Sequence, residues 1–274
     1  MIRCRATAAR AAAMILIALA PAAHAQFPEK PLRFLVGLTA GSLTDTSARA
    51  LAKAAGKHMD KPIVVMNVTG ASGSVAMNAL ATAPADGYTV ALMPSSYRFL
   101  TVHTQKVPFD PATLKVLLGY AELRYVLFVK GDSPYASFED LVAYGRKNRG
   151  AVAFGHSGRG TGIQLVGTAF FRLAGIEATD VPFKGSIDYV NAVLGGNLLA
   201  GVVDVSGVAQ QVRAGRLKLV VAFTEERMNE FPEVPTAREK GYPDLNSLNT
   251  MLTIIAHKDT PPDRERVLHD IFRK

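Results

Sequence analysis

The chain contains a single cysteine, Cys4, near its amino-terminal end. A protein without a second thiol cannot form an internal disulfide, and it offers no cysteine cluster for a structural zinc ion. The six histidines are scattered and none has the H-x-x-x-H spacing. The composition therefore gives no reason to expect a metal or another cofactor.

Blocks of lysine and arginine are also lacking, and no basic stripe is interleaved with aromatic residues. We therefore expect no nucleic-acid partner. The formal net charge is +8, and it falls to +5 without the three arginines of the first ten residues. A mildly positive surface of this kind favours the approach of small anions.

The first 25 residues have the pattern of a secretory signal peptide. Arg3, Arg5 and Arg10 precede a short apolar stretch at 11–20, and the tripeptide Ala-His-Ala at 23–25 fits an A-x-A cleavage site. The apolar stretch is too short to span a bilayer. No cysteine follows the cleavage site, so a lipid anchor is not indicated. We expect export to the periplasm and removal of the signal.

Apolar runs at 32–38, 63–67 and 89–93 lack polar alternation, which is typical of parallel strands covered on both faces. The first two runs lead through small-residue loops at 39–45 and 70–74 into alanine-rich helical patterns. Unpaired N–H groups and the helix dipole favour an anion above such loops. The alternative is that they are ordinary turns between strands and helices.

The first of these helices is expected at 45–57, with Thr44 as its N-cap and Asp45 in a capping role. The order of strand, Gly/Ser loop and helix returns in the second half, around 151–162 and 181–194. We therefore predict two α/β lobes, the first formed by 26–103 and 222–274 and the second by 104–221. A cleft between them, beyond the carboxyl ends of the strands, would close on a small molecule.

Four blocks follow one another through nearly the whole mature chain. They are K-P-L-R-F-L-V at 30–36 with the loop ending in Thr44-Asp45; N-V-T-G-A-S-G at 67–73 with A-P-A-D-G-Y-T at 83–89; V-P-F-K-G at 181–185 with L-G-G-N at 194–197; and A-G-R-L-K at 214–218 with F-P-E-V-P-T at 231–236 and K-G-Y-P at 240–243. In this order they resemble the Bug family of periplasmic solute receptors, the binding components of tripartite tricarboxylate transporters.

The resemblance implies a two-lobed, type II-like periplasmic binding protein fold and a non-catalytic receptor that is monomeric. Its ligand would be a small mono-, di- or tricarboxylate or an acidic amino acid. Its partner would be the membrane subunits of a transporter, or a sensor kinase to which it presents the ligand.

The candidate ligand-binding residues come from the loops that end the strands of both lobes. They are Thr39, Ala40, Ser42, Thr44, Gly70, Ala71, Ser72, Ser95, Ser157, Gly160, Thr161, Gly162, Lys184 and Asp204. Lys184 either counters a ligand carboxylate or is simply solvated. Asp204 either holds a ligand amine or ordered water, or caps the turn near Ser206.

The chain departs from the family pattern at two places. Ala40, Ser42 and Leu43 stand where the family has proline and glycines, and the bulky Leu43 occupies a position that would favour glycine. The family also continues beyond this chain, so we expect a shortened carboxyl-terminal end, with 261–274 as the beginning of a helix of the first lobe. A truncated, non-binding remnant of the receptor family is therefore one alternative.

A second alternative is a secreted α/β serine hydrolase. Ser157 lies between a predicted strand and helix, and Asp204 and His257 follow it in the order of that triad. However, a nucleophile elbow requires glycine two residues after the serine, where this chain has Arg159. The pattern therefore favours a ligand-binding loop over a nucleophile.

Overall fold

The computed structural model describes residues 27–248 and 250–273. The predicted signal peptide lies outside the described residues. None of the helices in the described ranges is long and apolar enough to cross a membrane.

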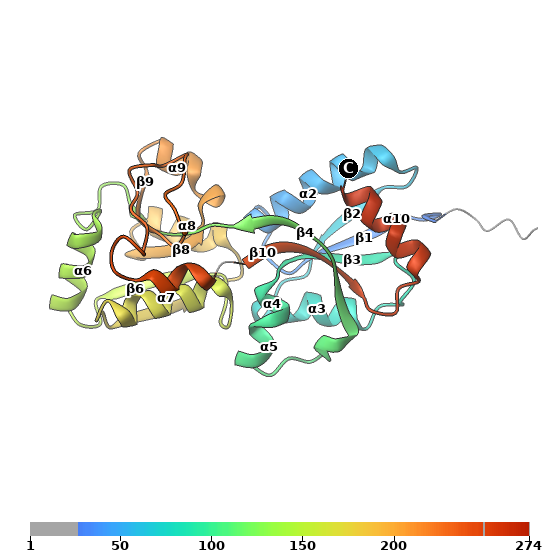
Figure 1. Ribbon diagram of the computed structural model, residues 1–274, viewed down its shortest axis with the longest axis horizontal. Coiled ribbons are helices and arrows are strands. Elements are labelled where there is room, and N and C mark those ends of the chain that lie inside the picture. Colours follow the sequence, from blue (N-terminus) through green and yellow to red (C-terminus); the bar gives the residue numbers. More distant parts are fainter. Residues whose placement is uncertain (1–26, 249, 274) are drawn as a thin grey trace, which may run out of the picture.

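The described residues form two α/β lobes that lie end to end along the molecule's long axis (Figure 1). The strands are β1 (Leu32–Val36), β2 (Ile63–Asn67), β3 (Thr89–Pro94), β4 (Leu114–Leu123), β5 (Tyr125–Lys130), β6 (Val152–His156), β7 (Ala178–Pro182), β8 (Ala200–Asp204), β9 (Leu217–Ala222) and β10 (Thr250–His257). The helices are α2 (Leu43–Ala55), α3 (Ser74–Ala81), α4 (Ser96–Phe99), α5 (Thr101–Thr104), α6 (Phe138–Lys147), α7 (Gly162–Leu173), α8 (Ser186–Leu194), α9 (Ala209–Arg213) and α10 (Pro262–Arg273).

The first lobe is built on a sheet with the strand order β2-β1-β3-β10-β4. β1 runs parallel to β2 and β3, whereas β10 is antiparallel to β3 and β4. Helices α2 and α10 lie on one face of this sheet and α3 on the other (Figure 1). β3 is buried along its whole length, as its unbroken apolar run predicts.

The second lobe repeats this plan with the strand order β7-β6-β8-β5-β9. β6 is parallel to β7 and β8, and β5 is antiparallel to β8 and β9. Helices α7 and α8 pack on this sheet. In both lobes the parallel strands end toward the other lobe, so the loops that follow β1, β2, β6 and β7 meet between them.

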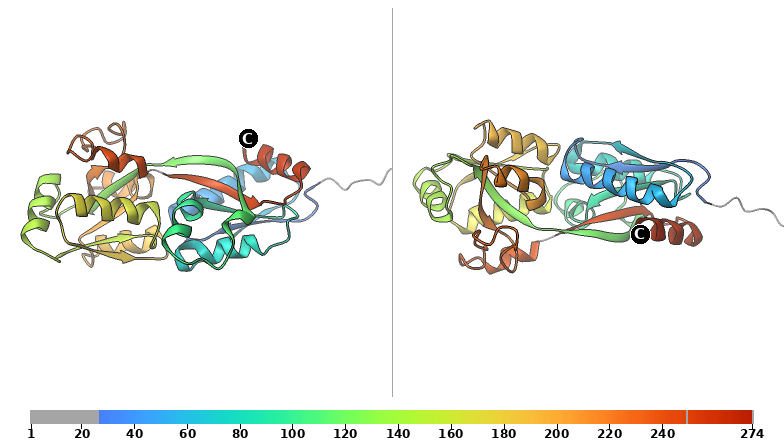
Figure 2. Two further views of the ribbon diagram at one scale, coloured as in Figure 1. Left: turned by 60° about the horizontal axis from the view of Figure 1, so that its bottom comes forward. Right: turned by 90° about the horizontal axis from the view of Figure 1, so that it is seen from above.

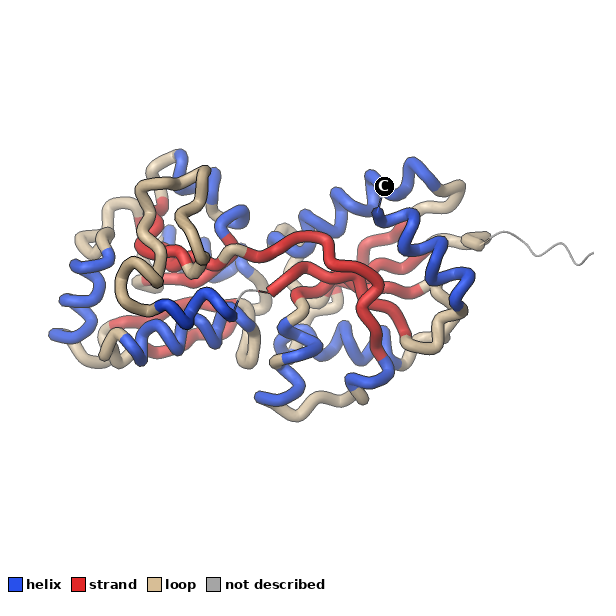
Figure 3. Tube along the Cα trace, in the orientation of Figure 1, coloured by secondary structure: helices blue, strands red, loops and turns tan. Residues whose placement is uncertain are grey.

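The chain passes from the first sheet to the second at β4–β5 and is again in the first sheet at β10, and β4 and β10 run side by side (Figures 2 and 3). β4 therefore belongs to the first sheet, whereas the sequence analysis placed 104–123 in the second lobe. β9 belongs to the second sheet, and Phe231 and Val234, which the sequence analysis placed in the first lobe with 222–274, pack in the core of the second lobe. β4 and β5 are consecutive apolar strands, so no change of pattern marks the crossing in the sequence.

Helix α2 begins two residues earlier than the sequence predicts. Its N-cap is Ser42, whose hydroxyl accepts a hydrogen bond from the Asp45 N–H at 3.4 Å. Thr44, the predicted N-cap, is a buried residue inside the first turn. Leu43 is helical, so this position does not require a glycine backbone.

Candidate functional site

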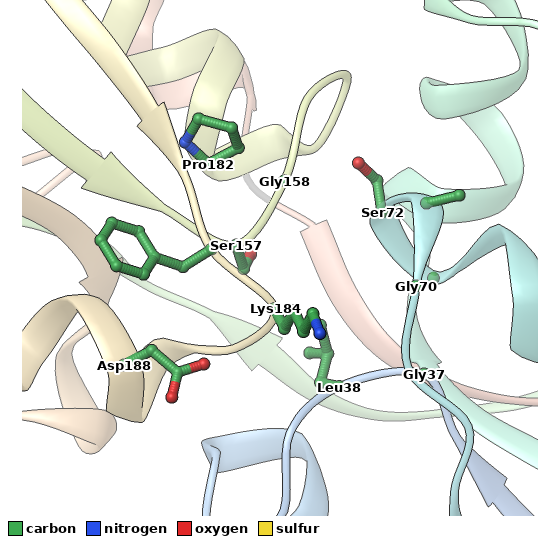
Figure 4. A pocket seen from close by; sticks show the side chains of 12 residues that line it. Gly37, Leu38, Gly70, Ser72, Ser157, Gly158, Pro182, Lys184 and Asp188 are labelled. Atoms are coloured by element: carbon green, nitrogen blue, oxygen red, sulfur yellow. The ribbon is translucent and has the colours of Figure 1, made fainter.

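A cavity of about 520 Å³ lies between the lobes, at the carboxyl ends of the parallel strands (Figure 4). This volume is in the range of small-molecule sites. The residues that line it are Gly37, Leu38, Gly70, Ala71, Ser72, Gly73, Ser157, Gly158, Pro182, Phe183, Lys184 and Asp188.

The wall from the first lobe is formed largely by the turn between β2 and α3. Gly70, Ala71, Ser72 and Gly73 all have positive φ, at 135°, 44°, 51° and 80°. For alanine and serine such a conformation costs on the order of 1–3 kcal/mol each and is concentrated at functional sites. The turn lines the cavity with small side chains, and α3 begins directly after it. The dipole of α3 favours a ligand anion there.

A polar network around the buried Asp45 holds the loop after β1 in place beside this turn. The Asn67 side-chain amide donates to Leu38 O at 3.0 Å and to Asp45 Oδ1 at 2.8 Å, and Arg49 Nε donates to Asp45 Oδ2 at 3.0 Å. Burial acts to raise the pKa of Asp45, but the hydrogen bonds from Arg49, Gly41 and Asn67 together hold the pKa below its ordinary value. The loop after β1 is therefore fixed by a charged aspartate that does not face the cavity.

The wall from the second lobe rests on a buried histidine. His156 is fully buried at the end of β6; its Nδ1 lies 3.0 Å from Gly158 O and 3.2 Å from Gly158 N, and its Nε2 lies 3.1 Å from Asp180 Oδ2. Each ring nitrogen therefore has an acceptor within hydrogen-bond distance. The histidine thereby shapes the loop that presents Ser157 and Gly158 to the cavity.

Protonation of His156 at low pH is expected to destabilise the folded protein. Burial is the main cause that lowers the pKa of His156 below 6.5, although Asp180 opposes it. The folded state then binds fewer protons than the unfolded state, so the free energy of unfolding decreases as pH falls below about 6.5, by at most about 1.4 kcal/mol per pH unit. Urea unfolding between about pH 8 and pH 5 measures this slope. His156→Gln should flatten it, and an equal slope in both proteins would contradict the assignment.

The two lobes touch each other directly around the cavity. Thr39 Oγ1 donates to Asp188 Oδ2 at 3.1 Å, and Thr39 N donates to Lys184 O at 3.3 Å. On the other side, Tyr97 OH donates to Ser157 O at 3.2 Å and Thr101 Oγ1 donates to Gly160 O at 3.1 Å. Backbone carbonyls accept three of these four bonds, so the contact depends on close approach of the loops.

Of the fourteen predicted ligand-binding residues, five line the cavity. They are Gly70, Ala71, Ser72, Ser157 and Lys184. Two more, Thr39 and Gly160, lie in the contacts between the lobes. The remaining seven lie outside the cavity lining.

Most of those seven have other structural roles. Ser42 and Thr161 are the N-caps of α2 and α7. An added Cβ at Gly162 would contact Thr250 and Tyr125 at 3.1 Å. Ser95 N donates to Met251 O at 2.7 Å, between strands. Thr44 is buried within α2, and Ala40 is exposed on the loop before it.

Asp204 lies at the crossing between the lobes. Its carboxylate accepts hydrogen bonds from Arg124 N at 2.6 Å and Ser206 N at 2.9 Å, which is the capping alternative that the sequence left open. His257 contacts Asp259 at the far end of β10. The hydrogen bonds of the described residues therefore do not assemble Ser157, Asp204 and His257 into a triad. Nor do the described residues contain a cluster of three potential metal ligands.

The sequence analysis missed seven residues of the lining. Six of them, Gly37, Leu38, Gly73, Gly158, Pro182 and Phe183, are close chain neighbours of predicted residues. The seventh, Asp188, lies in the first turn of α8. An acidic residue at a helix start complements the helix dipole, so the sequence offered no separate reason to place Asp188 at the cavity.

A comparison with known protein families matches residues 47–274 to the tripartite tricarboxylate transporter family receptor. The chain belongs to this receptor family. Its members are solute-binding receptors, not enzymes, and the resemblance noted in the sequence is confirmed.

Individual relatives show how far the similarity extends. A UPF0065 protein of Cupriavidus necator is 32% identical over 97% of this chain and 81% of its own length. Protein BugT of Bordetella pertussis is 31% identical over 89% of this chain and 75% of its own. The structure of R. palustris Rpa4515 with adipate superposes with a TM-score of 0.85 at 26% identity, covering 90% of this chain and 83% of that one. The predicted two-lobed fold is confirmed.

Proposed function

We propose that the protein binds a small carboxylate in the periplasm, after removal of its signal peptide, and delivers it to a tripartite tricarboxylate transporter or to a sensor. The single observation that carries this proposal is the cavity between the lobes, where a run of positive-φ residues faces Lys184. The similarity to the structure of R. palustris Rpa4515 with adipate supports the ligand class.

In this proposal the ligand carboxylate lies between the two lobes. The turn at Gly70–Gly73 offers backbone N–H groups, Ser72 and Ser157 offer hydroxyls, and Lys184 supplies the positive charge. Contact with both walls stabilises the closed arrangement relative to an open one, and the membrane partner recognises the closed form. The protein acts as a monomer, with no cofactor.

The proposal is tested by thermal unfolding of residues 26–274 with a panel of carboxylates that includes adipate. A ligand at 100 times its dissociation constant stabilises the folded state by about 2.7 kcal/mol. The neutral diamide of adipate serves as the matched control, because it keeps the chain length and lacks the charges. We expect a carboxylate to raise the melting temperature while its amide does not. A cooperative transition that none of the carboxylates moves would reject the proposal.

A further inference from the structure

Two of the twelve lining residues carry a formal charge, and both come from the second lobe. Lys184 lies in the loop after β7, and Asp188 follows four residues later in the first turn of α8. Figure 4 shows both side chains reaching into the space between the lobes, with the Lys184 side chain directed toward Leu38 and the first-lobe wall.

These two charges do not neutralise each other. Among the described residues, neither Lys184 nor Asp188 takes part in a salt bridge within 4.0 Å. The carboxylate of Asp188 accepts a neutral hydrogen bond from Thr39 Oγ1 at 3.1 Å. A ligand in the cavity therefore meets one positive and one negative group, each without a counterion among residues 27–248 and 250–273.

The opposite wall adds no further side-chain charge. It consists of Gly37, Leu38 and the turn 70–73, whose side chains supply apolar surface and one hydroxyl. A dicarboxylate could place one end against Lys184 and this turn, but its second carboxylate would share the cavity with Asp188. Like charges in a partly desolvated site repel each other, whereas an ammonium group at that end would form a charge-assisted hydrogen bond.

We propose that the cavity selects an amino acid, with its carboxylate at the Lys184 side and its ammonium group at Asp188, over a dicarboxylate of equal length. This inference rests on the proposed function and narrows its ligand class. Asp188 is then the residue that determines specificity.

Asp188 has two structural roles that the test must separate from charge recognition. It complements the dipole of α8, and it accepts the Thr39 hydrogen bond that joins the lobes. Asp188→Asn keeps an oxygen acceptor for Thr39 and removes the charge. Thr39→Val removes the hydrogen bond between Thr39 Oγ1 and Asp188 and keeps the charge, so it is the matched control.

The experiment measures dissociation constants by calorimetry for pairs of equal carbon number: β-alanine with malonate, γ-aminobutyrate with succinate, δ-aminovalerate with glutarate, and aspartate with succinate. γ-Hydroxybutyrate distinguishes a charged from a neutral donor. In the unaltered protein we expect an amino acid to bind about tenfold or more tightly than its dicarboxylate partner, the effect of a charge-assisted hydrogen bond. In Asp188→Asn this ratio should fall about tenfold or more, and in Thr39→Val both affinities should fall while the ratio stays.

Three results would overturn the inference. They are a dicarboxylate preference in the unaltered protein, a ratio that Asp188→Asn leaves unchanged, or equal binding of γ-hydroxybutyrate and γ-aminobutyrate. In each of these cases carboxylates still bind, so the proposed function survives. If neither the amino acids nor the dicarboxylates bind, and adipate also fails, the proposed function itself is rejected.

Discussion

Gly158→Ala is expected to weaken binding of the best carboxylate ligand about 10- to 100-fold. A Cβ at this position would lie 2.6 Å from Ser72 Oγ and 3.1 Å from Ser72 Cα, across the boundary between the lobes. Overpacking of this kind typically costs about 1–3 kcal/mol, and each 1.4 kcal/mol is a factor of ten in affinity. Because the clash exists only when the lobes are together, it acts against closure. Calorimetry measures the affinity, and X-ray scattering in solution measures the shift toward an open form.

Two further variants separate the clash with Ser72 from strain in the backbone of residue 158, since Gly158 also has φ +119°. Gly150→Ala is the matched control: it lies in the same lobe with φ +74°, and an added Cβ there has no heavy atom within 4 Å. It should leave affinity unchanged. Adding Ser72→Gly to Gly158→Ala removes the two opposing atoms that would lie nearest to the new Cβ, Ser72 Oγ and Cβ, and should restore part of the binding. If the double variant recovers no affinity, the loss comes from backbone strain at residue 158, and the explanation by a clash between the lobes is wrong.

Gly73→Ala should destabilise the first lobe by about 2–5 kcal/mol. Its Cβ would lie 2.5 Å from Met93 Cε and 2.5 Å from two ring carbons of the buried Tyr97. Overpacking contributes about 1–3 kcal/mol, and the positive φ of 80° adds about 1–2 kcal/mol for a residue with a Cβ. Urea unfolding measures the loss.

Gly41→Ala is the control for backbone strain in this comparison. Gly41 has the same φ of +80°, but a Cβ there would meet no heavy atom within 4 Å. We expect it to lose only the strain part, about 1–2 kcal/mol. Equal losses for both variants would show that the space around Gly73 can relax and that packing there is not tight.

The sequence predicted the repeated unit of the fold because that unit is local. A continuous apolar run, a Gly/Ser loop and an amphipathic helix follow one another within about 30 residues, as at β1–α2 and β6–α7, so both lobes could be recognised. The boundary between the lobes could not be predicted in this way, because β4 pairs with β10, more than a hundred residues away. Which sheet a strand joins depends on that distant partner.

The site was predicted in part for the same reason. Strand ends such as Gly70–Ser72 and Ser157 lie at the carboxyl edge in any parallel sheet, and these were found. Asp188 lies in a helix, and its presence at the cavity depends on how the lobes meet. Ser95 and Asp204 also follow strands, but antiparallel neighbours β10 and β5 occupy the space beside them. Pairing direction decided which strand ends remain open to a ligand.

The two crossings between the lobes restrict how the molecule can move. They lie side by side, since Thr250 pairs with Leu123, and Tyr125 OH is hydrogen-bonded to Thr250 Oγ1. Two adjacent connections favour a hinge motion of the lobes over sliding. Asp204, which accepts a hydrogen bond from Arg124 N, lies beside them. An additional bond across the two connections would therefore slow the release of ligand without altering any group that touches it.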